Sequence, residues 1–94
     1  MNKYESVIII NPNLEDAKIK DLIERFSKLV NEHGKLEKAD EMGKKRLAYP
    51  IQKQTEGFYV TLYFEAEPAF IAELERVYRI TDEVLKFIVV GLED

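Results

Sequence analysis

Apolar and polar positions along the first third of the chain predict a strand followed by an amphipathic helix. Residues 4–10 form a β-branched run that is apolar on both sides, which is typical of an interior strand, and Asn11-Pro12-Asn13 ends it with a turn signal. Apolar residues then recur at helical spacing from Ile19 to Val30, and Asn13 suits the N-cap of this helix. Gly34 should end the helix, in the left-handed conformation that glycine adopts after a last turn.

The middle of the chain predicts two strands joined as a hairpin. Residues 35–51 have extended character, with Gly43 marking a bulge or bend. Pro50 requires an edge position, because proline cannot donate a backbone hydrogen bond to a neighbouring strand. Residues 52–56 form a polar connection, and residues 58–65 are the clearest strand. The side chains expected against the helices are Phe58, Val60, Leu62 and Phe64, and those expected on the uncovered face are Tyr59, Thr61 and Tyr63.

The last third predicts a second helix and a fourth strand. This helix begins at Pro68, carries an apolar stripe from Ile71 to Tyr78 and ends at Thr81-Asp82, before a strand over residues 84–90. The order is therefore strand, helix, strand, strand, helix, strand. It matches the ferredoxin-like split βαβ arrangement, an α+β sandwich in which two helices cover one face of a four-stranded antiparallel sheet. We expect a single domain over residues 1–94, because this length supplies one core.

Few groups in the sequence suit catalysis. There is no cysteine, which excludes disulfides and thiol nucleophiles. The single histidine, His33, cannot by itself build a histidine-dependent triad or a zinc site of several His ligands. It lies at the expected C-terminus of the first helix, where a positive charge interacts favourably with the helix dipole. No glycine-rich phosphate loop is present. We therefore expect no catalytic residue, no metal and no cofactor.

The overall charge limits how the chain could bind nucleic acid. The formal net charge is −4, which weakens any expectation of RNA binding through bulk electrostatics, so the positive charge would have to be local. The longest apolar runs, such as residues 7–10 and 87–90, are too short to span a bilayer, and no signal segment is visible at the N-terminus. We therefore expect a cytoplasmic protein with no membrane partner.

Two features could bind RNA. The first is Gly43-Lys44-Lys45-Arg46, followed at once by Leu47-Ala48-Tyr49-Pro50-Ile51, which places cations, a tyrosine and an edge proline on one margin of the sheet. Basic groups there would bind phosphates, and Tyr49 could stack on a base or pack against a partner. Such a short basic run is more often solvated surface, and Tyr49 could simply lie at the rim of the core.

The second feature is the tyrosine-containing outer row of residues 59–63, which has a weak likeness to the base-stacking strand of RNA-recognition-motif domains. This row could equally dock a protein or stabilise cross-strand pairs.

The segment Glu41-Met42-Gly43-Lys44-Lys45-Arg46-Leu47-Ala48-Tyr49-Pro50-Ile51 closely resembles the signature of the bacterial ribosomal protein S6 family. Tyr4-Glu5, Asn11-Pro12-Asn13-Leu14 and Arg79-Ile80-Thr81-Asp82 also fit, so the likeness extends in order over nearly the whole chain. The resemblance implies a ferredoxin-like structural protein of the small ribosomal subunit that supports subunit assembly and translation. It also implies binding to small-subunit ribosomal RNA in the central domain (the platform), together with the small basic ribosomal protein S18. Neither catalysis, nor a cofactor, nor a small-molecule substrate is implied.

Carried over residue by residue, the resemblance also implies sites. The RNA-binding candidates are Lys3, Lys44, Lys45, Arg46, Tyr49, Lys53, Tyr63, Arg79 and Lys86. The candidates for docking the partner protein are Ala48, Tyr49, Pro50 and Ile51. Lysine stands where the family often has arginine at Lys3, Lys45 and Lys86, so those contacts lose bidentate geometry. Thr81 stands where a basic residue can occur. Because S18 would bring most of the positive charge, we expect weak RNA binding by the isolated chain and stronger binding by the pair.

Three other functions fit a chain of this size and topology. A regulatory module would bind a small molecule at a dimer interface. An acylphosphatase-like enzyme would need a glycine-rich, arginine-containing loop where this chain has Ile10-Asn11-Pro12-Asn13-Leu14. A protein scaffold without RNA contact is the most serious rival, and the run Lys44-Lys45-Arg46 argues against it only modestly.

Overall fold

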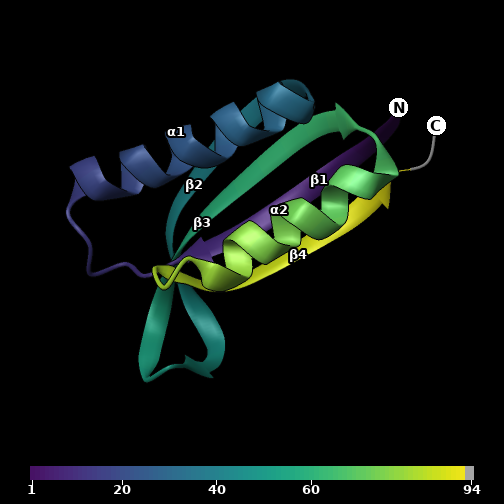
Figure 1. Ribbon diagram of the computed structural model, residues 1–94. Helices are drawn as coiled ribbons and strands as arrows, with labels where there is room; N and C mark the ends of the chain where they lie inside the picture. The colour runs from purple at the N-terminus through teal and green to yellow at the C-terminus, as the bar shows by residue number, and fades with distance from the viewer. Residues whose placement is uncertain (93–94) are drawn as a thin grey trace.

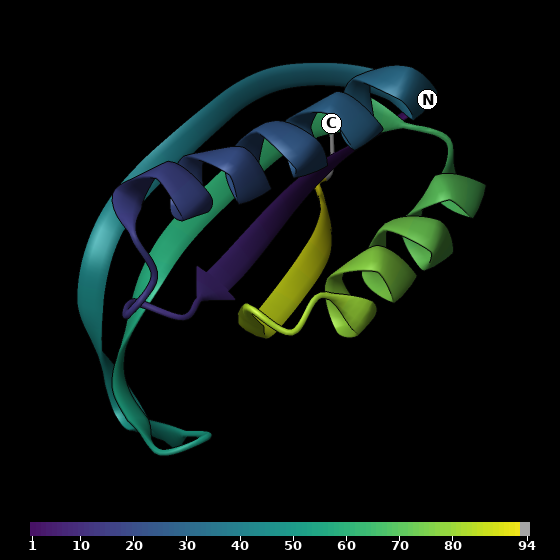
Figure 2. The same cartoon turned by 60° about the vertical axis from the view of Figure 1, so that its left-hand side comes forward.

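The computed structural model describes residues 1–92, and its elements follow the predicted order. They are β1 (Asn2–Ile10), α1 (Asp16–His33), β2 (Gly34–Ile51), β3 (Gln54–Ala66), α2 (Pro68–Ile80) and β4 (Val84–Leu92). The four strands form one antiparallel sheet in the order β2-β3-β1-β4 (Figure 1). Both helices lie on the same side of this sheet (Figure 2), so the predicted ferredoxin-like sandwich is confirmed. The side of the sheet that the helices do not cover is called the open face below.

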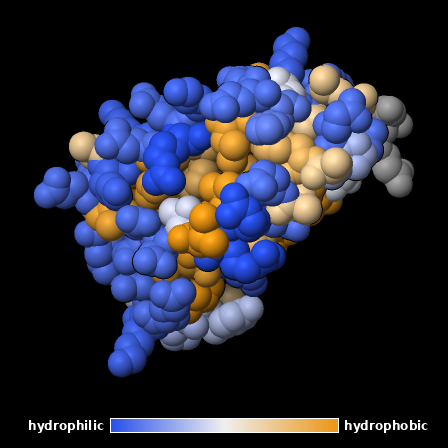
Figure 3. All heavy atoms as spheres, in the orientation of Figure 1, coloured by the Kyte–Doolittle hydropathy of each residue, from blue (hydrophilic) through white to orange (hydrophobic). Residues whose placement is uncertain are grey.

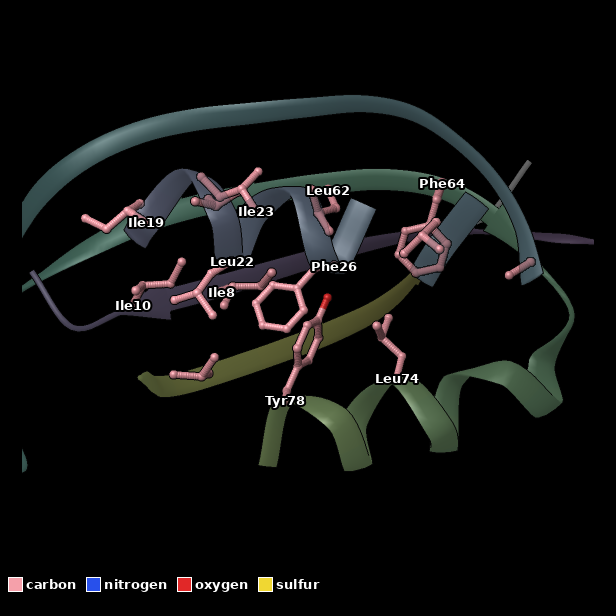
Figure 4. Close-up of a cluster of buried hydrophobic side chains, with 14 of the residues drawn as sticks. Ile8, Ile10, Ile19, Leu22, Ile23, Phe26, Leu62, Phe64, Leu74 and Tyr78 are labelled. Atoms are coloured by element: carbon pink, nitrogen blue, oxygen red, sulfur yellow. The ribbon is translucent and has the colours of Figure 1, made fainter. Parts of the chain in front are cut away.

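The core lies between the sheet and the two helices, and it is built from the inner rows that the sequence pattern predicts (Figure 4). On β3, Val60, Leu62 and Phe64 are buried, while Phe58 is half-buried at the margin. Apolar transfer contributes about 1.5–3 kcal/mol for each such side chain, so the inner row fixes which face of β3 meets the helices. The buried side chains contributed by the other elements are Ile8, Ile10, Ile19, Leu22, Ile23, Phe26, Val30, Phe70, Leu74, Tyr78 and Val84.

The helix layer is mostly hydrophilic outside, with apolar atoms showing in a strip between the helices (Figure 3). A shallow groove of about 260 Å³ there has Phe26, Leu29 and Val77 among its lining residues. His33, at the end of α1, stacks on the Phe70 ring with the ring centroids 4.8 Å apart. The structure thus gives His33 a packing role at the helix end.

One buried polar pair crosses the core. The hydroxyl of Tyr78, on α2, shares a 2.8 Å hydrogen bond with the hydroxyl of Ser6 on β1. The Tyr78 ring meets the edge of the Phe26 ring at 4.9 Å between centroids, the T-shaped arrangement that aromatic pairs favour (Figure 4). Both hydroxyl groups are buried, and each satisfies the other. The pair therefore ties α2 to the centre of the sheet without leaving an unpaired polar atom.

Because of this pair, we expect the free energy of unfolding to decrease at alkaline pH. Burial raises the pKa of Tyr78 well above its ordinary value of 10.0, and the hydrogen bond to Ser6 opposes that shift only in part. Because the folded pKa is raised, the contribution is fully present below pH 10 and is lost as pH rises through the folded pKa. We expect the free energy of unfolding to fall above pH 10 by up to about 1.4 kcal/mol per pH unit from this group. Urea unfolding followed by circular dichroism between pH 8 and about 11 measures it.

The Ser6→Ala/Tyr78→Phe double variant isolates this effect from the other tyrosines and the lysines. Tyr78→Phe alone leaves the Ser6 hydroxyl buried without a partner, which costs about 1–3 kcal/mol. The double variant removes both polar groups and should be close to the wild type at pH 7. Above pH 10 its free energy of unfolding should decrease less per pH unit than that of the wild type. Identical alkaline slopes for the two proteins would show that Tyr78 does not ionise on unfolding.

One predicted helix boundary and one predicted cap conformation are wrong, although α1 does end at Gly34 as predicted. Asn13 is not the N-cap of α1, because Glu15 takes that position without a side-chain cap hydrogen bond. Asn13 instead donates its backbone N–H to the side-chain oxygen of Asn11 and its amide to Gln54 on β3, so it closes the turn before the helix. Gly34 is not left-handed: its φ of −174° is extended, and it begins β2. A Cβ at Gly34 would collide with the backbone carbonyl oxygen of Glu65, which explains why glycine stands there.

The hairpin between β2 and β3 has a shorter turn and longer strands than predicted. The polar connection expected over residues 52–56 is only a two-residue turn, Gln52-Lys53, with both residues at positive φ, and Ile51 pairs with Gln54. Gly43, at φ +82°, lies where the register shifts, so the predicted bulge is confirmed. Pro50 lies on an edge strand, as predicted, because β2 is at one side of the sheet.

The end of this hairpin projects beyond the rest of the sheet. The last residue of β1, Ile10, pairs with Phe58, so residues 54–57 of β3 pair only with β2. We call residues 44–57 the hairpin arm; it extends past the helices and bends at its tip (Figures 1 and 2). This arm carries most of the candidate RNA-binding residues, so its placement decides the site.

Candidate nucleic-acid interface

The hairpin arm curls over the end of the open face because of what lies at its base. Gly57 faces Ile9 of β1, and a Cβ there would collide with the Ile9 side chain. The space is filled instead by Leu47 from the facing strand, which is buried. Leu47 thus anchors the arm, and Tyr49, two residues later, points to the same side of the strand. The glycine and the leucine together aim Tyr49 across the open face.

This curl joins residues from the two opposite edges of the sheet. The Lys86 Nζ, on β4, lies 5.9 Å from the ring centroid of Tyr49, although β2 and β4 are not neighbours. The Lys45 Nζ lies 6.0 Å from the ring centroid of Tyr59. We call these four side chains the aromatic–cation cluster. Three of the four, all but Lys45, border a hollow of about 110 Å³, whose lining residues are Ile9, Leu47, Ala48, Tyr49, Ile51, Tyr59 and Lys86.

Three further candidates lie on the arm but outside the cluster. Lys44 pairs with Phe58 and Arg46 with Glu56, so both side chains leave β2 on the side opposite Lys45. Lys53 lies in the turn at the tip, with φ of 68°. Of the four docking candidates, Ala48, Tyr49 and Pro50 are exposed and Ile51 is half-buried. The arm therefore carries positive charge on both of its sides.

The remaining candidates lie apart from the arm. Lys3 is six residues before Ile9 on β1, about 20 Å away along the strand, and its Nζ is 4.0 Å from a carboxylate oxygen of Glu65. The Arg79 guanidinium lies 5.8 Å from the ring centroid of Phe87, between α2 and β4. The structure brings neither of them to the hairpin arm.

Tyr63 lies on the open face beside charges of both signs, and the Lys38 Nζ lies 6.0 Å from its ring centroid. Desolvation, and then the nearby carboxylates of Glu5 and Asp40, raise the pKa of Tyr63 above its ordinary value. The same carboxylates repel phosphate. The outer row of β3 faces away from the helices as predicted, but Thr61 is buried, because its short side chain lies on an inner strand between its cross-strand partners Val7 and Asp40.

The open face also has an apolar row that sequence reasoning did not single out. Ile88, Val90 and Leu92 of β4 are 49%, 46% and 38% exposed. They alternate with side chains that face the helices, and Ile88 pairs with Val7 of β1 on the same side. The signal was present as a period of two within residues 84–92, but a run apolar on both sides predicts only a strand, not an exposed surface.

The described part of the chain has no metal-binding arrangement: residues 1–92 contain no group of three or more His, Asp or Glu side chains that could hold an ion. In the same range, no helix has the length and apolar character needed to cross a membrane.

A model of the family described as ribosomal protein S6 matches residues 3–91. The chain belongs to the ribosomal protein S6 family. Small ribosomal subunit protein bS6 of Caldanaerobacter subterraneus subsp. tengcongensis is 46% identical over 95 aligned positions, covering the whole of both chains. The bS6 protein of Clostridium novyi is also 46% identical and is covered to 99%, as is this chain. The crystal structure of ribosomal protein S6 from Thermotoga maritima superimposes with a TM-score of 0.93 at 35% identity, covering 97% of this chain and 87% of that one.

Family membership confirms five expectations drawn from the sequence. The family resemblance is correct, and the S6 fold is the ferredoxin-like sandwich described above. The protein is a structural component of the small ribosomal subunit, not an enzyme, and its place is the cytoplasmic ribosome. The acylphosphatase-like alternative is therefore excluded.

Proposed function

We propose that this S6 protein binds small-subunit ribosomal RNA in the platform through its hairpin arm, together with ribosomal protein S18. One observation supports the arm above the rest of the surface. Five cations gather on it or beside it, and within residues 1–92 none of them has a carboxylate oxygen within 4.0 Å. They are Lys44, Lys45, Arg46, Lys53 and Lys86.

Local charge, not net charge, decides such a contact. A phosphate interacts mainly with protein charges that lie within about one Debye length of it, close to 8 Å at physiological salt. A cationic arm can therefore bind RNA even on a chain of net charge −4. The acidic body still repels RNA at longer range, which lowers the affinity of the chain alone. A basic partner next to the arm removes that repulsion. The pair is therefore the RNA-binding unit.

The open face is where the partner fits. Ile88, Val90 and Leu92 expose apolar surface beside Val7, and exposed apolar patches on small proteins mark interaction sites. Three of the four docking residues of the arm, Ala48, Tyr49 and Ile51, border the same face. S18 seated there contacts the arm and the sheet at once, and the RNA then meets a surface built from both proteins.

The test is binding of a platform RNA fragment with and without S18. Lys45→Ala/Arg46→Ala removes a cation from each side of the arm, and both residues are exposed, so the fold should be kept. We expect tight binding only with S18, weakened in the variant by about 1–3 kcal/mol and with a smaller salt dependence. Fluorescence anisotropy titrations between 50 and about 300 mM salt give both quantities.

A matched double variant controls for general loss of charge. Lys20→Ala/Lys28→Ala removes two exposed cations from α1, on the opposite layer of the molecule, and should leave RNA affinity within a factor of about two. Equal losses for the two double variants would show that net charge, not the arm, governs binding. Full affinity of the arm variant would place the RNA elsewhere on the surface.

A further inference from the structure

The two edges of the sheet differ in how well they are protected against pairing with another strand. β2, at one edge, carries charged side chains along most of its length, contains Pro50 and shifts its register near Gly43. Such features keep an edge strand from pairing with a second chain. β4, at the other edge, has one charged residue, Lys86, and it pairs regularly with β1 from there to Leu92. β4 therefore presents an unprotected edge of backbone N–H and C=O groups.

A second copy of β4 fits this edge by symmetry. Two identical strands pair antiparallel about a two-fold axis, and the register that overlaps the whole of β4 places its middle residue, Ile88, on that axis. Ile88 then faces Ile88 of the second copy on the open face, and Phe87 faces Val89 of the second copy on the helix side. Lys86 faces Val90 of the second copy and keeps its ammonium in water. The central contacts of this register are thus apolar.

The same axis fixes how the two copies of α2 would meet. α2 lies along β4 (Figure 1), and level with Phe87 are Tyr78, at 5.3 Å between ring centroids, and Arg79, whose guanidinium is 5.8 Å from the Phe87 centroid. One residue of strand advances about 3.3 Å, as far as about two residues of helix. Because α2 and β4 run in opposite directions, Ile88 is level with residues 76–77 of α2.

Opposite charges on α2 lie on either side of that level. Glu75 and Arg79 are one turn apart on the same side of the helix. This side is turned away from α1, because Val77 lines the groove between the helices while Arg79 lies over β4. The two-fold axis makes the helices antiparallel, so Glu75 of each copy meets Arg79 of the other. Within residues 1–92 neither side chain has an opposite charge within 4.0 Å, so both are available to a second copy.

We propose that two copies of the chain associate through their β4 edges, with two Glu75–Arg79 ion pairs across the axis. The two four-stranded sheets then continue into each other, and the α2 helices lie side by side. The dimer goes beyond the proposed RNA binding and needs neither RNA nor S18. One strand pair and one helix pair make a small interface, and the net charge of −4 on each copy opposes association. The dimer should therefore be weak and should form at high concentrations of the free chain.

The test is the mass of the purified chain in solution, combined with reversal of the two charges. Sedimentation velocity at about 0.15 M salt should show a dimer that grows between about 5 and 500 µM. Glu75→Arg and Arg79→Glu each place like charges across the axis and should raise the dimer Kd at least about tenfold. An equimolar mixture of the two variants restores opposite charges, so it should dimerise like the wild type.

Glu24→Arg and Lys28→Glu are the matched controls. They make the same changes of net charge at an exposed pair with the same spacing, on α1, which packs over β2 and β3 and not over the β4 edge. Each should dimerise like the wild type. Hydrogen exchange gives a readout that does not depend on charge: amides of β4 should exchange more slowly in the concentrated sample, and amides of β2 should not.

The outcomes separate the dimer from the RNA-binding function. A chain that stays monomeric at the highest concentration would overturn the dimer and leave RNA binding with S18 unaffected. A dimer that ignores the charge reversals on α2, or that mixing the two variants does not restore, would place the contact on another surface and overturn pairing through β4. Protection of β2 amides in place of β4 amides would overturn it as well.

Discussion

Gly34→Ala should destabilise the protein by about 3 kcal/mol, a large fraction of the 5–15 kcal/mol that holds a small domain folded. The added Cβ would overlap the carbonyl oxygen of Glu65 and approach the Cα of Ala66 to 3.0 Å. Both belong to the backbone of β3, next to the centre of the sheet, so no side chain can swing aside to make room. Urea unfolding at pH 7 measures the loss as a lower midpoint with an unchanged slope.

Two other glycines separate this steric effect from conformational ones. At Gly91 an added Cβ would meet only the ring of Tyr4, at 3.8 Å, so Gly91→Ala should be neutral within about 0.5 kcal/mol. Gly43 has open space around it but a φ of +82°, so Gly43→Ala should cost about 1 kcal/mol through backbone strain alone. The expected order of stability is Gly91→Ala, then Gly43→Ala, then Gly34→Ala. A Gly34→Ala protein as stable as the wild type would mean that the start of β2 can move away from β3.

The role of Gly34 shows how far local patterns carry a fold prediction. Periodicity identified both helices and the strand β3, because burial of one face leaves a period of 2 or 3.6 in the sequence itself, and short apolar or extended runs identified the other strands. The reason for glycine at position 34 lies thirty-one residues away, at Glu65, and no local signal contains it. Asn13 is similar: its amide binds Gln54 across the fold and not the first turn of α1. Boundaries fail where a distant contact outweighs the local preference.

In the candidate site, too, some residues could be found from the local sequence and others only from tertiary packing. Lys45 and Tyr49 were visible as a cationic run followed by an aromatic residue. Lys86 entered only through the family resemblance, because its contact with Tyr49 exists once the arm curls past Gly57 and Leu47. That curl depends on packing between strands and cannot be predicted from the hairpin alone. Lys3 and Arg79 carry the same charge as Lys86 but lie away from the arm. The number of cations in the sequence therefore does not show which of them belong to one site.

Ile88→Asp should reduce the affinity of the chain for S18 by at least about 100-fold, close to 3 kcal/mol. Ile88 is 49% exposed in the free protein, so the new carboxylate stays hydrated and the fold should lose no more than about 1 kcal/mol. Under a docked partner the same carboxylate would lose its hydration opposite the apolar Val7, and Lys86, two residues earlier on the same face of β4, would offset that cost only in part. Isothermal titration calorimetry of the two purified proteins measures the loss.

Ile80→Asp is the matched control, because it makes the same substitution on the helix layer at a residue that is 64% exposed. It should bind S18 like the wild type, which would show that the face, and not one added negative charge, decides the result. Lys45→Ala/Arg46→Ala should also keep most of the affinity for S18 while losing affinity for RNA. Wild-type association by Ile88→Asp would move the partner off the apolar row of β4 and onto the arm alone. In that case the exposed surface of Ile88, Val90 and Leu92 would need another occupant, and RNA and S18 would compete for one site instead of occupying adjoining ones.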